Sequence, residues 1–285
     1  MGCGPTEGVS ELTTAANGAS ADGREVRFQK LTRPELNTYA ERSATVLIPI
    51  GAIEQHASHL PVETDIFNST TVSTAAAEHF DDVLVAPPIP WGLSDAHVPL
   101  GGTISLRPAT FIELAMDITA TLADSGFRRL CWLNGHNGNK GVMTVIVYES
   151  KRLHGLSVGA VTYYDLAVSA YQEARTSGPG GSGHACEFET SLMMHLNPEA
   201  VGDYKAAAVR MIEGRTLNDF GDLADPGLTA IGYTFPERFP EGIMGDPTVA
   251  EAETGRLIYD ASLKGVVAFL EEFRTHPPEG VRVES

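Results

Sequence analysis

The feature of this sequence that most constrains its fold is the alternation of short apolar runs with longer segments of helical periodicity. Four apolar runs occur at residues 44–51, 83–86, 129–133 and 157–163. Helical patterns occur at residues 68–80, 108–126, 140–154, 187–196 and 249–275. Continuous apolar runs are typical of strands buried on both faces, and strands that alternate with helices form parallel sheets. The sequence therefore predicts an α/β fold, a single-domain three-layer α/β/α sandwich with a mostly parallel sheet.

The predicted sandwich accounts for all but the first residues of the chain. Residues 1–25 are rich in Gly, Ala, Ser and Thr, which predicts a disordered N-terminal tail before one domain over residues 26–285. The sequence contains no internal repeat and no linker between domains. The glycine-rich residues 177–183 are too short for a linker and favour a mobile loop beside an active site.

Charge and cysteine content exclude several classes of partner. The 37 Asp and Glu against 20 Lys and Arg give a net charge of −17, which leaves no basic surplus to bind a nucleic acid. No apolar run approaches the roughly 20 residues that span a bilayer, and the N-terminus lacks an apolar signal segment. The three cysteines are widely spaced and form no disulfide framework. We therefore expect a cytoplasmic protein without a membrane partner.

Acidic residues and histidines follow the predicted strands, at the edge where parallel sheets bind ligands. They are Glu54, His56 and Asp65 after the first run, His136 after the third, and His184, Glu187 and Glu189 after the glycine-rich loop. Because the carboxyl ends of parallel strands meet at one edge, we expect these side chains to converge. Mixed imidazole and carboxylate ligands suit Zn²⁺, Mn²⁺ or Fe²⁺. The pattern therefore favours a divalent-metal site.

Each of these residues also has a purely structural interpretation. A Glu-x-His pair is usually part of a solvated loop, and Asp65 fits the N-cap of the following helix. His136 beside Asn-Gly fits a turn, His184 fits a loop, and acids in a first helical turn are explained by the helix dipole. The recurrence of three such clusters favours the metal site, but the spacing alone leaves both interpretations open.

Three of these runs resemble the creatininase (creatinine amidohydrolase) family. They read GAIEQHASHLPVETD, LNGHNGN and GHACEFETSLM, and two weaker blocks at residues 91–106 and 242–255 occur in the family's order. The resemblance implies a hydrolase of carbon–nitrogen bonds with two divalent metal ions. It also implies a homo-oligomer, a hexamer, that acts on a small molecule.

The resemblance also implies which residues hold the metals. Glu54, Asp65 and His136 match the family's ligands of one ion. His56 and Asp65 match the ligands of the other ion, so that Asp65 bridges the two. In creatininase proper, an acid two residues after the metal histidine completes the second site, but this chain has Gly138 there. Glu187 stands where the family has an apolar residue, and we infer that Glu187 supplies the missing carboxylate.

The catalytic proton carrier is also implied by the resemblance. His184 matches the family's catalytic histidine, a general acid and base for the leaving nitrogen. We expect Glu189 to orient the His184 imidazole. The alternative, which stays open, is that Glu189 only stabilises the N-terminus of its helix. Ser94, His97 and Asn137 are expected to contact the substrate, and Trp91 to line the pocket or to fill the core.

The substrate is where this chain departs from creatininase proper. The aromatic residue that holds the creatinine ring is replaced by glycine at 180–181, so creatinine is not the expected substrate. An amide or cyclic amide is expected, with a peptidase of the mycofactocin-maturation type, a formamide hydrolase, a cyclic-ketone hydrolase of inositol breakdown or a non-enzymatic binding protein as alternatives. Few basic residues favour a neutral or cationic substrate, although Arg107, Lys140 and Arg215 could supply local positive charge.

Overall fold

The central sheet consists of four parallel strands. The computed structural model describes residues 23–212, 222–223 and 232–278, so most of the predicted tail lies outside the described residues. The strands are β1 (Thr45–Ile50), β2 (Val83–Val85), β3 (Arg129–Asn134) and β4 (Ser157–Thr162), in the order β2-β1-β3-β4. All residues of β1 are buried, as the continuous apolar run predicts for a central strand of a parallel sheet.

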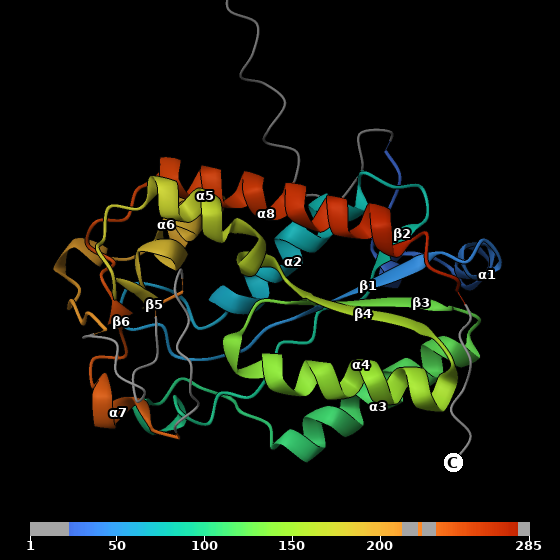
Figure 1. Ribbon diagram of the computed structural model, residues 1–285, viewed down its shortest axis with the longest axis horizontal. Helices are drawn as coiled ribbons and strands as arrows, with labels where there is room; N and C mark the ends of the chain where they lie inside the picture. Colours follow the sequence, from blue (N-terminus) through green and yellow to red (C-terminus); the bar gives the residue numbers. More distant parts are fainter. Residues whose placement is uncertain (1–22, 213–221, 224–231, 279–285) are drawn as a thin grey trace, which may run out of the picture.

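Helices cover both faces of this sheet. The main helices are α2 (Thr64–Ala77), α3 (Pro108–Asp124), α4 (Lys140–His154), α5 (Val168–Ala174), α6 (Glu187–Leu196) and α8 (Ala252–Phe273). Figure 1 shows α2, α5, α6 and α8 on one face and α3 and α4 on the other. None of the described helices is both long and apolar enough to cross a bilayer. The three-layer α/β/α sandwich is therefore confirmed.

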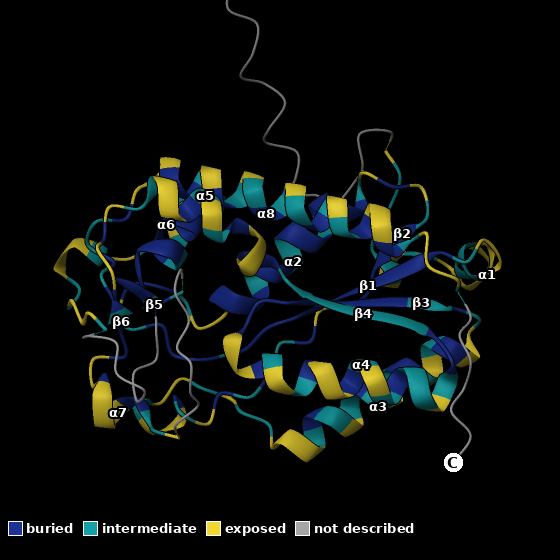
Figure 2. Ribbon diagram, in the orientation of Figure 1, coloured by how far each residue is buried: buried dark blue, intermediate teal, exposed yellow. Residues whose placement is uncertain are grey.

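Alternate residues of the strands feed two separate cores. Leu47 and Leu133 belong to the core beneath α2 and α8, whereas Ile48 and Trp132 belong to the core beneath α3 and α4. This division follows from the two-residue period of a strand, whose successive side chains point to opposite faces. The buried strands β1 and β2, the largely buried β3 and the half-buried β4 lie between helices whose outer faces are exposed (Figure 2).

Helix bounds agree best with the prediction where the sequence carries strong stop signals. Helices α4 and α6 have the predicted bounds, and α4 ends at Gly155, which adopts the left-handed conformation (φ 65°) that favours glycine. Helix α2 begins at Thr64 rather than at residue 68, so Asp65 lies in its first turn and is not its N-cap. Helix α1 (Arg33–Glu41) was not predicted, although its capping box of Thr32 and Glu35 is present in the sequence.

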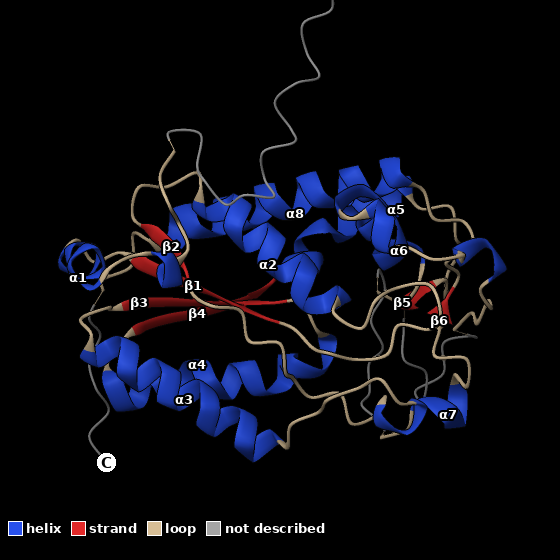
Figure 3. Cartoon of the chain, turned by 180° about the vertical axis from the view of Figure 1, so that it is seen from behind, coloured by secondary structure: helices blue, strands red, loops and turns tan. Residues whose placement is uncertain are grey.

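A short antiparallel ribbon closes one end of the sandwich. Strands β5 (Ser182–His184) and β6 (Met244–Gly245) form this ribbon, and helix α7 (Phe235–Arg238) lies beside it. The ribbon and α7 lie at the end opposite α1 (Figure 3). Strand β5 therefore brings the segment that follows the glycine-rich loop toward the edge where the parallel strands have their carboxyl ends.

Candidate metal centre

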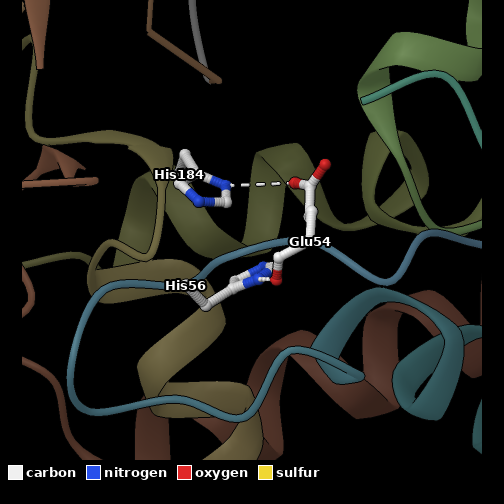
Figure 4. A group of neighbouring side chains, drawn as sticks. All are labelled: Glu54, His56 and His184. Atoms are coloured by element: carbon white, nitrogen blue, oxygen red, sulfur yellow. Dashed lines mark hydrogen bonds and ion pairs between the residues drawn. The ribbon is translucent and has the colours of Figure 1, made fainter. Parts of the chain in front are cut away.

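Acidic and histidine residues from five places in the chain converge beyond the sheet. They are Glu54 and His56 after β1, Asp65 in the first turn of α2, His136 after β3, His184 at the end of β5, and Glu189 in the first turn of α6. Three groups of them bring their ligand atoms within 4.8 Å of one another: Glu54–His56–His184, Glu54–Asp65–His136 and His56–Asp65–Glu189. The first group is drawn in Figure 4. The convergence predicted from the parallel sheet is thus present.

Asp65 belongs to two of the three metal-binding groups. Its Oδ1 lies 3.3 Å from Nε2 of His56, and its Oδ2 lies 2.9 Å from Nδ1 of His136. Glu54 makes a similar pair of approaches, with Oε2 3.4 Å from Nδ1 of His136 and Oε1 3.4 Å from Nδ1 of His184 (Figure 4). Asp65 therefore faces His56 and His136 with its two oxygens, which is the arrangement of a bridging ligand, whereas Glu54 also approaches Nε2 of His97 at 3.6 Å.

Backbone carbonyls orient the three imidazoles. The contacts join Nδ1 of His56 to the Glu54 carbonyl at 3.0 Å, Nε2 of His136 to the Leu93 carbonyl at 3.0 Å, and Nε2 of His184 to the Gln55 carbonyl at 2.7 Å. A carbonyl only accepts, so in each neutral ring that nitrogen carries the hydrogen. The other nitrogen then presents its lone pair to the carboxylates, as in metal-ligating histidines.

Several atoms of this cluster lack the partners that buried polar atoms ordinarily have. Among the described residues, Oε2 of Glu54, Oδ2 of Asp65 and Nε2 of His56 are buried without a hydrogen bond. Buried polar atoms are rarely left unpaired, because each costs the free energy of its desolvation. Tetrahedral ligands bound at about 2.1 Å lie roughly 3.4 Å from one another. The separations above fit this value, so the residues suit divalent metal ions.

The pKa values describe a cluster that requires compensating positive charge. Burial raises the pKa of Glu54 to about 7. Burial opposes the protonation of His136, but the Glu54 charge and the hydrogen bond to Asp65 outweigh it and raise the pKa of His136 to about 9. Burial would likewise raise the pKa of Asp65, but the His136 and His56 imidazoles beside its two oxygens lower it below the usual range. Protons therefore occupy the cluster without metal, and metal binding must release them.

His184 differs from the other two imidazoles in its charge state. Burial, followed by the charges of His56 and His97, holds the pKa of His184 well below its usual value. Burial also lowers the pKa of His97 to about 2. Both rings are therefore neutral over the physiological range, and His184 is able to accept a proton.

The buried His59 makes stability depend on pH. Burial, and then the charge of His56, lower the pKa of His59 to about 4. The unfolded chain takes up a proton here below about pH 6.5, so the stabilisation is complete above that pH and is lost on the way down to about pH 4. Between pH 7 and 5 we expect the wild type to lose about 2 kcal/mol more unfolding free energy than His59→Gln.

Urea unfolding of both metal-depleted proteins at the two pH values measures this difference. Because both chains retain the same metal-site groups, the contribution of those groups cancels in the comparison. Equal losses in the two proteins would contradict the assignment to His59.

The structure corrects the prediction that Glu187 is a metal ligand. Its carboxylate is buried away from the three groups and accepts hydrogen bonds from the backbone amides of Thr176 and Ser177, at 2.7 and 2.8 Å. The hydroxyls of Ser177 and Tyr171 donate to the same carboxylate. Glu187 thus anchors the start of the glycine-rich loop, because four donors hold its carboxylate away from the metal-binding groups.

The structure also corrects the role expected of Glu189. Its Oε1 lies 3.8 Å from Nε2 of His56, and its Oε2 accepts a hydrogen bond from the amide of Ala185 at 2.5 Å. It therefore joins His56 and Asp65 instead of orienting the His184 imidazole, which is held by the Gln55 carbonyl. Glu189 occupies the place that was assigned to Glu187.

The glycine-rich loop predicted to be mobile is held at several points. The amide of Gly180 donates to Asp222, whose carboxylate also pairs with Arg175 at 2.8 Å. The carbonyl of Ile212 lies where a Cβ at Gly180 would stand, and Gly180 has a φ of +84°. These contacts fix the loop that leads into β5 and His184.

A cavity of about 510 Å³ opens onto the metal-binding groups. Three of the predicted substrate residues, Ser94, His97 and Asn137, line this cavity. Trp91 neither lines it nor fills the core, because its side chain is 44% exposed. The prediction that Trp91 lines the pocket or fills the core is therefore wrong, since this residue lies on the surface.

Sequence analysis missed the aromatic residues of the cavity wall. Tyr163 and Tyr164 follow β4 directly, so the rule that located the other site residues at strand ends also applies to them. Phe235 packs on the His97 ring with centroids 3.9 Å apart, and Tyr233 lies beside Phe235. No sequence signal marks these last two residues, which come from a segment remote from the metal-binding motifs.

Gln55 is a further residue that sequence analysis missed. Its Nε2 lies 3.0 Å from Nδ1 of His97 and 3.1 Å from Nε2 of His184. Its Oε1 accepts a hydrogen bond from the backbone N–H of Ala57 at 3.0 Å, which fixes the orientation of the Gln55 side chain. Gln55 therefore donates from its side-chain amide to the neutral His97 ring, while its backbone carbonyl accepts from Nε2–H of His184.

Comparisons with known proteins agree with this geometry. A family model described as creatinine amidohydrolase matches residues 29–270. A mycofactocin precursor peptide peptidase of Mycobacterium tuberculosis (strain CDC 1551 / Oshkosh) is 30% identical over 82% of this chain and 88% of its own length. A creatinine amidohydrolase of Pseudomonas putida is 28% identical over 82% and 92%.

Solved structures share the fold along nearly the whole chain. A structure described as "Creatininase Mn" has a TM-score of 0.77 and 25% identity, covering 89% of this chain and 100% of its own. A mutant creatininase of the Zn-Zn type has a TM-score of 0.76 and 25% identity at the same coverage. The family match covers most of the chain and includes every segment that contributes to the metal-binding groups. The chain therefore belongs to the creatininase family of amidohydrolases.

Proposed function

We propose that this protein is a metal-dependent amidohydrolase that cleaves an amide or cyclic amide bond of a small molecule with two divalent ions. The observation that carries the proposal is the convergence of buried, unpaired carboxylate and imidazole atoms beside a cavity. The ligands are Glu54, Asp65 and His136 for one ion and His56, Asp65 and Glu189 for the other.

The donor set limits which ions fit. Imidazole nitrogens with carboxylate oxygens suit Zn²⁺ or Mn²⁺, with Fe²⁺ a further option. The names of the two creatininase structures mention manganese and zinc. When bound, two such ions lower the pKa of a water molecule and polarise the scissile carbonyl.

His184 is the proposed proton carrier. Its Nε2–H is held by the Gln55 carbonyl, so the free Nδ1 faces the cluster beside Glu54. A neutral imidazole in this place accepts the proton that the attacking water loses and delivers it to the leaving nitrogen. Phe235 packs 5.0 Å from the His184 ring and shields it from solvent.

A peptidase of the mycofactocin-maturation type is the second candidate. The peptidase relative is 30% identical to this chain, and a cavity of about 510 Å³ has room for more than a small cyclic amide. A formamide hydrolase has no comparable support. The complete set of ligand atoms argues against a binding protein without catalysis.

A cytoplasmic homo-oligomer, a hexamer, completes the proposal. It rests on the family resemblance. No partner is required for the metal-binding groups, which all come from one chain.

Metal removal tests the proposed function. Chelated protein should not hydrolyse a panel of cyclic amides, formamides and short peptides, and either Zn²⁺ or Mn²⁺ should restore hydrolysis with two equivalents bound. His184→Ala should retain the metal and lower kcat at least about 100-fold, because only proton transfer is lost.

The exposed His79 provides the matched control, since His79→Ala removes an imidazole from the surface. Hydrolysis that survives complete metal removal would contradict the proposal. A loss of less than tenfold in His184→Ala would contradict the role of this residue.

A further inference from the structure

The cavity extends beyond the metal-binding groups to a second set of polar side chains. This set consists of Lys140 at the start of α4 and the consecutive residues Tyr164 and Asp165 after β4. Among the described residues that line the cavity, Lys140 is the only lysine or arginine. The cavity thus has a metal-binding end and a cationic side chain near its opening.

The Tyr164 hydroxyl is a buried donor without an acceptor. The residue is 6% exposed and lines the cavity, yet its oxygen has no hydrogen bond to any described residue. Burial, and then the charge of Asp165, hold the pKa of Tyr164 well above its usual value, so the group stays an O–H donor. A buried unpaired hydroxyl in a cavity wall indicates that a ligand supplies the acceptor.

Lys140 lies directly beside this hydroxyl-bearing ring. Its Nζ is 4.8 Å from the centroid of the Tyr164 ring and 2.7 Å from Oδ1 of Asp165. The Lys140 side chain is 37% exposed and that of Asp165 is 49% exposed, so solvent weakens their ion pair. The ammonium group has three donors, and the pair with Asp165 uses one of them.

We propose that Tyr164 and Lys140 form an anion subsite that binds a carboxylate of the substrate, so that the substrate is an amide or short peptide with a free carboxylate. A carboxylate accepts both the phenolic O–H and an ammonium N–H, which are the donors present. Asp165 holds Lys140 in place and already offsets part of its charge, so the subsite suits a monoanion better than a phosphate dianion. The inference rests on the proposed function, whose bond cleavage takes place at the other end of the cavity.

This subsite revises the expectation of a neutral or cationic substrate. That expectation came from the low total of basic residues, which is an average over the whole chain. The structure places one basic residue in the cavity wall, where a single cation is sufficient to select charge. Of the other two basic residues considered, Arg107 does not line the cavity and Arg215 lies outside the described residues.

A matched pair of peptide pools tests the subsite. One pool contains equimolar Gly-Gly-X tripeptides with free carboxylates, and the other contains the same tripeptides as C-terminal amides. We expect the metal-loaded wild type to favour the carboxylate pool by about 10- to 100-fold in kcat/KM, the value of a charge-assisted hydrogen bond. The same pool should raise the thermal midpoint more than the amide pool does, which reports binding without turnover.

Three variants assign the preference to the subsite. Lys140→Gln and Tyr164→Phe should each reduce the preference, mainly through KM, whereas Asp165→Asn should increase it a few-fold by removing the competing anion. Lys151→Gln, in the last turn of the same helix, is the control and should leave the preference unchanged. Inorganic phosphate should compete more weakly than acetate.

The outcomes separate the subsite from the proposed function. Hydrolysis of both pools without preference would overturn the subsite and leave the amidohydrolase proposal standing. A thermal preference for carboxylates without hydrolysis of any amide would support the subsite and overturn the function. The absence of a preference in both measurements, or an unchanged preference in Lys140→Gln, would overturn the subsite.

Discussion

Asp65→Asn is expected to abolish metal binding at both positions and to lower kcat/KM by at least about 10⁴-fold, or roughly 5 kcal/mol of transition-state stabilisation. The two oxygens of Asp65 face different imidazoles, His56 and His136, so this carboxylate belongs to two of the three metal-binding groups. An asparagine has the same shape but replaces one oxygen by an amide donor. It therefore removes the bridging charge with little change in packing.

Elemental analysis and hydrolysis rates of the same preparation measure this effect. Asp203→Asn is a suitable control, because Asp203 is exposed and caps a short helical turn outside the metal-binding groups. Two equivalents of metal retained by folded Asp65→Asn would show that the residue does not bridge.

The second large effect distinguishes two glutamates on one helix. Glu189→Gln should lower bound metal from two equivalents to one and reduce kcat at least about 100-fold, because it removes a carboxylate that lies 3.8 Å from His56 in one of the metal-binding groups. Glu187→Gln should retain both equivalents. Its effect should be on stability, about 1–3 kcal/mol, because a glutamine presents an NH₂ group to donors that now meet a carboxylate.

Each of the two variants serves as the control for the other. Metal analysis and urea unfolding of both proteins give four values, and the expected pattern is a loss of metal in one and a loss of stability in the other. The reverse pattern would restore the assignment made from the sequence, in which Glu187 is the ligand.

This pair of glutamates shows why the sequence identified most of the site but not all of it. Glu54, His56, Asp65 and His136 follow strands or open a helix at one sheet edge, and the parallel topology is sufficient to bring them together. Residues two apart on a helix point about 200° away from each other, so only one of two such acids reaches the cluster. Which one does depends on the rotation of α6 about its axis, and long-range packing sets that rotation.

The fold was more predictable than the cavity wall. The four strands of the parallel sheet and the helices α3, α4 and α6 could be predicted because apolar runs, prolines and glycines mark their limits locally. Phe235 and Tyr233 contribute to the wall from a distant segment, through contacts that no local pattern records. The charge preference of the cavity likewise depends on the position of Lys140, which composition cannot report.

Backbone carbonyls hold the three imidazoles, and this affects which mutations the site tolerates during evolution. Leu93, Gln55 and Glu54 hold the rings through main-chain oxygens, which every residue type possesses. Mutations that exchange neighbouring side chains can therefore alter what enters the cavity while the orientation of the rings is inherited intact. Substrate recognition and catalytic chemistry are thus free to evolve at different rates. The main chain preserves the orientation of the catalytic rings, while side-chain changes alter substrate recognition.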